Sequence, residues 1–400
     1  MDEIVSSGAS ARLHSGARSH GAERFAVTYR LTVSDGRPVE AHARDIALEQ
    51  TVEVPPDCVP DGIAQAGVVG RIESVSGSGT EFEVVISYRA DLTGFSVPQF
   101  LNVLFGNISI KRGIKIVGLD LTDSLMRALG GPGFGIDGVR RLTGVFGRPL
   151  TCTALKPVGL PVRELAAMAG AYARGGLDLV KEDHGMADLA WHPFRERVAR
   201  CQEAVLEANA RTGRNSLFLP MISGGFDEIE AQVAHAKDLG IRGMLAAPFL
   251  VGPDAVRTLA RRYGMIVMAH PALTGTHFHD PRHGMTPAVL LGTLFRLFGA
   301  DVSIFPNSGG RFSFTRAECL DLADALRRPL GALKPAFPAP AGGMRLDSIA
   351  AMAEAFGPDT VLLIGGALMQ HSRDLEASAA AFADAVRACF GEARPASPEP

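Results

Sequence analysis

The feature that most constrains the fold is an alternation of short apolar strands and amphipathic helices that fills the chain from about residue 150 onward. The apolar strands are predicted at Leu150–Leu155, Leu177–Lys181, Leu217–Ile222, Gly243–Ala247, Met265–Ala269, Val302–Phe305, Ala332–Ala336 and Val361–Ile364. The helices that follow them are predicted at Val162–Arg174, Pro193–Arg211, Asp227–Leu239, Asp254–Arg262, Thr286–Phe298, Arg316–Arg327, Leu346–Phe356 and Leu375–Cys389. Eight strand–helix units in roughly 250 residues are typical of a barrel, whereas doubly wound sheets usually stop at about five or six strands. The sequence therefore predicts an α/β protein with a C-terminal (β/α)8 TIM barrel over residues 131–392.

The segment 24–130 has a different pattern, which predicts a smaller α+β domain in front of the barrel. Phe25–Val33 and Glu81–Tyr88 alternate apolar and polar residues and are rich in β-branched side chains, as strands are. Leu48–Pro55 lies between them in the same strand-like stretch, and Ser76–Thr80 predicts a turn before the second strand. Gly130–Gly138 has a GxGxxG-like spacing, but no clear strand precedes it, so a linker is favoured over a dinucleotide site.

Composition and charge exclude several classes of protein. Lys and Arg number 40 against 43 Asp and Glu, a net charge of −3, which argues against a nucleic-acid partner. No apolar run reaches the ~20 residues that span a bilayer, so no membrane association is expected. The five cysteines lack CxxC spacing and predict reduced thiols in the cytoplasm. Residues 1–23 contain no apolar signal-like stretch and are interpreted as a flexible arm, and residues 393–400 as a frayed tail.

Polar residues at the carboxyl ends of the barrel strands are the candidate site, because barrels build their chemistry there. Lys156 follows the first strand, His270 follows the fifth, and Lys181-Glu182-Asp183-His184 ends the second. Within a strand Lys181 and Asp183 face one side and Glu182 the other. Catalysis, a structural ion pair and a solvated charge run are all open interpretations of this run.

Two glycine pairs follow the last predicted strands, Gly342–Gly343 after the seventh and Gly365–Gly366 after the eighth. Their N–H groups can form the phosphate site that barrels often place at these loops, although paired glycines are also simple turns. A loop with His277, His279 and His283 has the composition of a metal site but matches no standard zinc spacing.

The run Gly175–Gly185, GlyGlyLeuAspLeuValLysGluAspHisGly, resembles the metal-site strand of the ribulose bisphosphate carboxylase/oxygenase large subunit. Further motifs follow in the order of that family along nearly the whole chain. They are LeuGluGlnThr (48–51), PheGlyAsn (105–107), GlyProGlyPheGlyIleAspGlyValArg (131–140), LeuLysPro followed by ValGlyLeu (155–160), AlaGlyGly (341–343) and IleGlyGly (364–366).

The departures from the carboxylase pattern argue against carboxylation. His184 stands where the family has a metal-site glutamate, Val158 follows Pro157 where the family has a second lysine, and Pro271 replaces an arginine. The short loop after the sixth strand carries Arg311 instead of the lysine that polarises the incoming gas. The chain therefore resembles the non-carboxylating branch, the RuBisCO-like proteins (form IV).

The resemblance implies roles for individual residues. Lys181 would react with CO2 to form a carbamate that binds Mg2+ together with Asp183. His184 would either ligate the metal, which favours another divalent ion over Mg2+, or act as an acid–base group. Lys156 would be the proton shuttle and His270 a second proton carrier or hydrogen-bond donor. The expected substrate-binding residues are Glu49 and Asn107 from the partner subunit of a homodimer or higher homo-oligomer, together with Arg311, Gly342, Gly343, Gly365 and Gly366.

The resemblance also implies chemistry through a metal-stabilised enediolate of a phosphorylated sugar or sugar acid. Because the gas-handling loop is changed while Lys181 and Asp183 are kept, the favoured activity is that of a carboxy-lyase. The expected reaction is decarboxylation of 3-oxo-isoapionate 4-phosphate or a similar β-keto sugar-acid phosphate. The alternatives are a tautomerase (enolase) or isomerase of a (methylthio)ribulose phosphate-like compound, and a non-catalytic sugar-phosphate binding protein.

Overall fold

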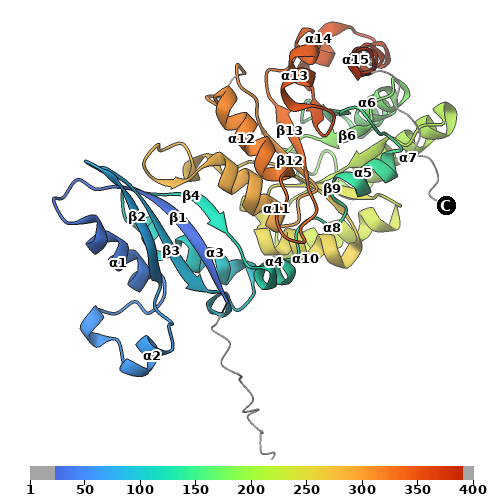
Figure 1. Cartoon of the computed structure of the whole chain (residues 1–400). Helices are drawn as coiled ribbons and strands as arrows, with labels where there is room; N and C mark the ends of the chain where they lie inside the picture. Colours follow the sequence, from blue (N-terminus) through green and yellow to red (C-terminus); the bar gives the residue numbers. More distant parts are fainter. Residues whose placement is uncertain (1–22, 311, 391–400) are drawn as a thin grey trace, which may run out of the picture.

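The computed structural model describes residues 23–310 and 312–390. The predicted arm, apart from Glu23, and the predicted tail lie outside this range, as does Arg311. Figure 1 shows an N-terminal sheet with its helices lying beside a C-terminal barrel, as the sequence predicts.

The N-terminal sheet has five strands in the order β11-β4-β1-β3-β2. β1 (Arg24–Thr32) pairs antiparallel with both β3 (Glu81–Arg89) and β4 (Ile114–Asp120), and β2 (Arg71–Ser78) pairs with β3. The predicted alternation is confirmed in β1, whose apolar side chains are buried. These are Phe25, Val27, Tyr29 and Leu31. The edge strand β11 (Gly284–Met285) comes from the barrel part of the chain, which ties the two parts together.

Helices and short turns complete the N-terminal part. They are α1 (Val39–Glu49), η1 (Pro56–Cys58), α2 (Asp61–Gln65), η2 (Ala90–Thr93), α3 (Val97–Phe105), η3 (Asn107–Ile110) and α4 (Asp123–Leu129). The strand-like interpretation of Leu48–Pro55 is wrong, because this segment holds the end of α1 and a loop. The side chain of Gln50 explains the loop: it is buried, its amide donates to the carbonyls of Asn102 and Val103, and its oxygen accepts the N–H of Ile108.

The barrel strands are parallel and follow the predicted order. They are β5 (Leu150–Leu155), β6 (Leu179–Glu182), β7 (Leu217–Leu219) continued by β8 (Met221–Ile222), β9 (Gly243–Ala246), β10 (Ile266–Ala269), β12 (Val302–Pro306), β13 (Phe337–Ala341) and β14 (Val361–Leu363). The predicted seventh strand, Ala332–Ala336, is wrong: the strand is β13, the next five residues. Its sequence PheProAlaProAla hides it, because proline is normally depleted from central strands.

β13 tolerates its prolines because of where their nitrogens point. The N–H of Phe337 donates to Asp301 just before β12, and successive backbone nitrogens of a strand face opposite sides. Pro338 and Pro340 therefore face β14, and no strand pairing joins β13 to β14 in the described residues. On that side β13 forms no backbone hydrogen bonds with a neighbouring strand of the described chain, so the two prolines remove none.

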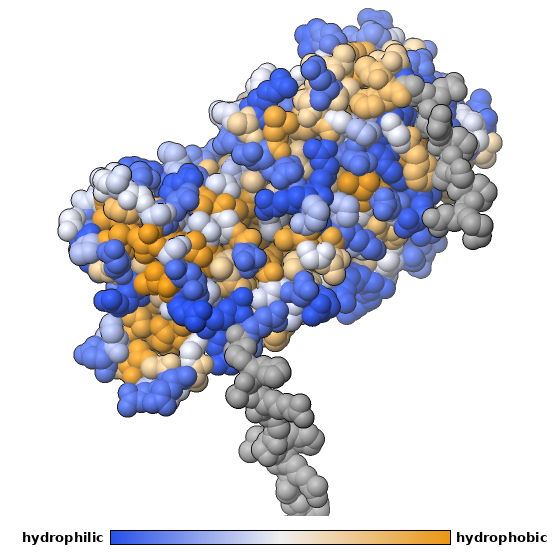
Figure 2. Space-filling view, viewed as in Figure 1, coloured by the Kyte–Doolittle hydropathy of each residue, from blue (hydrophilic) through white to orange (hydrophobic). Residues whose placement is uncertain are grey.

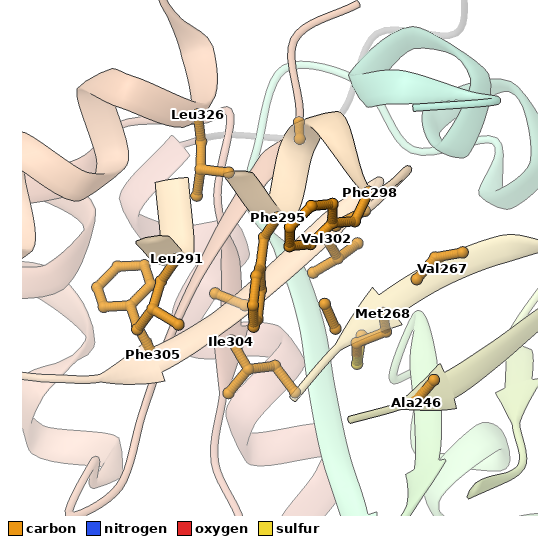
Figure 3. Close-up of a cluster of buried hydrophobic side chains, with 14 of the residues drawn as sticks. Ala246, Val267, Met268, Leu291, Phe295, Phe298, Val302, Ile304, Phe305 and Leu326 are labelled. Atoms are coloured by element: carbon orange, nitrogen blue, oxygen red, sulfur yellow. The ribbon is translucent and has the colours of Figure 1, made fainter. Parts of the chain in front are cut away.

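The barrel helices confirm the predicted alternation. They are α5 (Gly135–Thr143), α6 (Val162–Arg174), α7 (Phe194–Thr212), α8 (Phe226–Asp238), α9 (Pro248–Val251), α10 (Pro253–Tyr263), η4 (Gly275–His277), the π-helix η5 (Ala288–Leu294) with α11 (Phe295–Leu297), α12 (Arg316–Arg327), η6 (Leu346–Ser348), α13 (Ile349–Phe356), α14 (Gly366–His371) and α15 (Leu375–Phe390). The linker expected at Gly130–Gly138 ends early, since α5 begins inside it. Figure 3 shows part of the core between helix and sheet, where Phe295 lies near Val302 and Ile304 of β12 and Leu291 lies near Phe305.

The surface shows polar and apolar side chains interleaved, with apolar areas gathered on the N-terminal part of the face in Figure 2. Among the described residues, no helix combines the length and the apolar character that crossing a membrane requires. All five cysteines are free thiols, and Cys152, Cys201 and Cys319 are buried.

Candidate active site

A pocket of about 760 Å³ lies at the carboxyl ends of the barrel strands. Its lining brings together nine of the predicted site residues from five different strand ends. These are Lys156, Lys181, Asp183, His184, His270, Gly342, Gly343, Gly365 and Gly366. The sequence interpretation of the strand ends therefore locates one continuous site, as the barrel geometry predicts.

Asp183 is the electrostatic centre of the pocket. Its Oδ2 accepts a hydrogen bond from the Lys156 ammonium at 2.9 Å, and its Oδ1 lies 3.0 Å from His184 Nδ1 and accepts the backbone N–H of His184 at 2.9 Å. Burial opposes ionisation of this carboxyl, but the hydrogen bonds from His184 and Lys156 win and hold its pKa well below the usual range. Asp183 is therefore a carboxylate at neutral pH.

Lys181 lies on β6 with its side chain inside the barrel, only 3% exposed. Its Nζ donates to the Glu182 carbonyl at 3.0 Å. Burial lowers the pKa of Lys181, although Cys152 and Asp183 act in the opposite direction. A lowered pKa increases the neutral fraction of the amine, and the neutral amine is the nucleophilic form.

His184 and His270 stack face to face, with ring centroids 4.2 Å apart and an interplanar angle of 7°. His270 Nδ1 accepts the backbone N–H of Ala272 at 3.2 Å, so the proton of the neutral ring is on Nε2. Burial lowers the pKa of His270 to about 2, with Lys181 adding to the effect. His270 therefore enters the pocket as a neutral imidazole that can donate from Nε2.

Glu182 faces away from Lys181 and Asp183, as the strand alternation predicts. Both carboxylate oxygens bind the Arg197 guanidinium of α7, at 2.6 and 3.3 Å, and both side chains are completely buried. Glu182 Oε2 also accepts the N–H of Met221 at 2.9 Å. This pair links β6 to the helix behind it and to the next strand, and so fixes the strand that carries the site.

Both glycine pairs line the pocket, so their backbone is close to any ligand bound there. Gly342 and Gly343 have φ of +83° and +77°, a conformation that side-chain-bearing residues rarely adopt. A Cβ on Gly365 would lie 3.7 Å from Cε of Lys156, and α14 begins at Gly366. The phosphate role of these residues stays a prediction.

The remaining predicted residues lie elsewhere. Asn107 Nδ2 donates to Glu49 at 3.1 Å and to Glu53 at 2.9 Å, so these residues form a cluster on the N-terminal part and do not line the pocket. Arg311 lies outside the described residues. Of the three loop histidines only His279 lines the pocket, and no three His, Cys, Asp or Glu side chains of the described chain are grouped to hold a metal.

The sequence reasoning missed the apolar and peripheral part of the lining. The missed residues include Thr274, Phe278, Phe312, Phe314, Met344, Arg345 and Gln370. Most of them lie in the loops that follow barrel strands, and Gln370 lies on α14. Phe278 and Phe314 meet edge to face, with centroids 5.4 Å apart and an 80° interplanar angle, which makes one wall of the pocket aromatic.

Comparison with known proteins identifies the family. The model of the ribulose bisphosphate carboxylase large chain, catalytic domain, matches residues 135–307. The 5-methylthioribulose-1-phosphate isomerase of Rhodospirillum rubrum is 40% identical over 368 residues, covering 91% of this chain and 96% of that protein. A crystal structure of a Rubisco-like protein from Rhodopseudomonas palustris matches with a TM-score of 0.82 and 39% identity, over 93% of this chain and 99% of that one. The chain belongs to the RuBisCO-like proteins.

Another relative has a second activity in its name. The 2,3-diketo-5-methylthiopentyl-1-phosphate enolase of Bacillus pumilus is 29% identical over 372 residues, 90% of this chain and 91% of that protein. The resemblance stated from the motifs is thus confirmed, and so is the α+β domain followed by a barrel. The names of these relatives of this RuBisCO-like protein favour the isomerase or enolase alternative over the expected decarboxylation.

Proposed function

We propose that this RuBisCO-like protein is an isomerase that moves protons through an enediol of a phosphorylated keto-sugar of the 5-methylthioribulose 1-phosphate type. The observation that carries the proposal is the 40% identity to the named isomerase over 91% of the chain. The decarboxylase that we expected from the sequence has no support among the named relatives, and the proposal replaces it.

The chain's own groups supply the proton transfers. We assign Lys156 as the group that moves a proton at the carbon beside the ketone, because its Nζ lies in the pocket and is held by Asp183. His270 would donate from Nε2 to a substrate oxygen and share the charge that develops there. The stacked ring of His184 holds the His270 plane in place.

The two ends of the substrate would meet different walls. We assign its phosphate to the backbone N–H groups of the loops at Gly342–Gly343 and Gly365–Gly366. We assign its uncharged alkylthio end to the aromatic wall of Phe278 and Phe314, since thioethers contact aromatic rings favourably. A second phosphate or a carboxylate at that end would lose hydration against the two phenylalanine rings.

A divalent metal fits the pocket residues on one condition. Asp183 offers a carboxylate and His184 an imidazole, whereas the unmodified Lys181 offers an amine that repels a cation when protonated. Addition of CO2 to the neutral Lys181 amine, with release of one proton, would give a carbamate whose oxygens complete the set. When bound there, Mg2+ or another divalent ion supplies Lewis acidity toward the substrate's ketone.

The metal proposal has a test that does not depend on turnover. We expect Mn2+ to bind the protein more tightly in the presence of bicarbonate, as followed by the electron paramagnetic resonance of the free ion. Lys181→Ala should remove the bicarbonate effect, while the control Arg30→Met should keep it. Equal Mn2+ affinity with and without bicarbonate would refute the carbamate.

The proposed activity is tested with 5-methylthioribulose 1-phosphate in D2O, with Mg2+ and bicarbonate present. We expect a new ketose phosphate isomer and solvent deuterium at the exchanged carbon, both visible by NMR. Lys156→Ala should lower kcat by at least about a hundredfold, since general acid–base groups contribute about 10² to 10⁴. Binding of the ligand without any exchange would support the non-catalytic alternative, and release of labelled CO2 from a β-keto sugar-acid phosphate would restore the decarboxylase.

We further propose a homodimer in which the cluster of Glu49, Glu53 and Asn107, with Lys111 paired to Glu49 at 3.6 Å, faces the pocket of the partner. Two observations support this arrangement. Glu49 and Asn107 belong to motifs that resemble the family's, and the cluster does not line the pocket of its own chain. Ile110, next to the cluster, is 84% exposed, which fits a surface covered by a second copy. Light scattering should give twice the monomer mass, and Ile110→Asp should shift the protein toward the monomer.

A further inference from the structure

The loop that follows β10 forms one side of the pocket and is anchored outside the barrel. Thr274, Phe278 and His279 of this loop line the pocket. Further along, β11 joins the N-terminal sheet as a parallel neighbour of β4, with Gly284 opposite Lys115 and Met285 opposite Ile116. One wall of the site is therefore attached to a sheet that belongs to the other part of the molecule.

Lys115 makes the second attachment. It lies on β4, is only 6% exposed, and its Nζ donates to the carbonyls of Phe278 at 3.2 Å and Asp280 at 2.5 Å. Asp280 and Glu318 act on this ammonium through their charge, but in the described part of the chain neither forms an ion pair with it. A buried ammonium is costly unless its hydrogen bonds are satisfied, so these two carbonyls matter to both sides of the contact.

We propose that Lys115 is a positioning residue of the site: its ammonium fixes the backbone at Phe278 and Asp280 and thereby sets the aromatic wall of the pocket. The Phe278 ring packs against Phe314 at 5.4 Å and against His279 at 4.8 Å, so a shift of the Phe278 backbone moves the neighbouring lining side chains. Lys115 itself does not line the pocket. Its influence on ligand binding passes through the loop.

The kinetic arm of the test rests on the proposed function. With 5-methylthioribulose 1-phosphate, Lys115→Met should raise KM about tenfold while kcat changes less than about twofold, because the wall binds ground state and transition state alike. Lys115→Arg should restore most of the KM, since a guanidinium can donate to two carbonyls. A variant that only weakened the fold would not be rescued in this selective way.

The matched control is Arg30→Met. Arg30 lies directly opposite Lys115 in the β1–β4 pairing and is also a cation, but its side chain is exposed and pairs with Glu83 at 3.2 Å. We expect Arg30→Met to leave KM at the wild-type value. A rise in KM equal to that of Lys115→Met would show a general effect of charge in this sheet and would overturn the proposal.

Hydrogen–deuterium exchange tests the same idea without any substrate. Lys115→Met should speed exchange about tenfold or more in the amides of residues 272–286 and leave the barrel helices α6 and α7 unchanged. Unchanged exchange in this loop, or equally faster exchange throughout the chain, would overturn the positioning role. If Lys115→Met does not fold, Lys115→Gln serves instead, because an amide keeps one donor group and shortens the reach.

The kinetic and the exchange measurements distinguish failure of the proposed function from failure of the positioning role. A wild-type protein that does not isomerise the substrate refutes the proposed function, while the exchange measurement still decides the role of Lys115. A wild-type protein that turns over normally, together with unchanged exchange and KM in Lys115→Met, refutes the positioning role alone.

Discussion

Removing Arg197 should destabilise the protein far more than removing any surface arginine. Its guanidinium binds both oxygens of Glu182, the Ala187 carbonyl at 3.0 Å and the His192 carbonyl at 2.6 Å, and its side chain has no solvent exposure. In Arg197→Met, the Glu182 carboxylate keeps the hydrogen bond from the N–H of Met221 and stays buried. The variant thus leaves a nearly unpaired carboxylate in the interior.

The magnitude follows from the burial of that carboxylate. Breaking a buried ion pair by removing one partner costs about 3–5 kcal/mol, because the remaining charge loses its compensation. The exposed pair of Arg30 and Glu83, with side chains 45% and 50% exposed, should contribute less than about 1 kcal/mol. We therefore expect Arg197→Met to lower the free energy of unfolding by several times more than Arg30→Met.

Urea unfolding at pH 7, followed by circular dichroism, measures this difference. Combining Glu182→Gln with Arg197→Met should recover part of the loss, because the double variant buries a neutral amide in place of an unpaired charge. Equal destabilisation by Arg197→Met and Arg30→Met, or no recovery in the double variant, would refute the reasoning.

Two further predictions concern stability. Burial raises the pKa of Asp301 to about 6, although hydrogen bonds from the N–H groups of Val267, Gly135 and Phe134 act in the opposite direction. Between pH 3.8, the usual pKa of an aspartate, and about pH 6, the native state therefore binds more protons than the unfolded state. The free energy of unfolding should therefore decrease as the pH rises through this window. Asp301→Asn should remove this pH dependence. Urea unfolding that gives the same pH profile for both proteins would contradict the prediction. A Cβ on Gly284, where φ is +92°, would lie 2.0 Å from the His277 carbonyl, so Gly284→Ala should lower the thermal midpoint clearly more than Gly79→Ala, whose φ of +65° has open space around it.

Much of the site was predictable because it depends on local periodicity. The two-residue repeat of a strand places Lys181 and Asp183 in the pocket and sends Glu182 to the other face, and the structure confirms all three. The strand ends that converge on the pocket follow from the order of the eight units, since parallel barrel strands deliver their carboxyl ends to one face.

The errors have equally physical causes. The prolines of β13 hid this strand, because the rule against proline in strands assumes a ladder partner on both sides and β13 pairs on one side only among the described residues. The strand-like interpretation of Leu48–Pro55 is wrong because the Gln50 side chain ties this segment to α3 through long-range hydrogen bonds. The aromatic wall was missed because apolar residues in a loop carry no motif until the fold brings Phe278 against Phe314.

The pairing of β11 with β4 could not be predicted from any local sequence pattern. Its two residues are too short to show periodicity, and their partner lies about 170 positions earlier in the chain. The conformation at Gly284 and the two carbonyls held by Lys115 have meaning only when both parts of the molecule are present. The barrel supplies the reacting groups of the pocket, whereas one of its walls depends on the N-terminal sheet of the same chain. An isolated barrel that lacked β4 would keep Lys181 and Asp183 in place and lose the hold on Phe278, so separating the two parts should impair ligand binding before it impairs the strand that carries the charges.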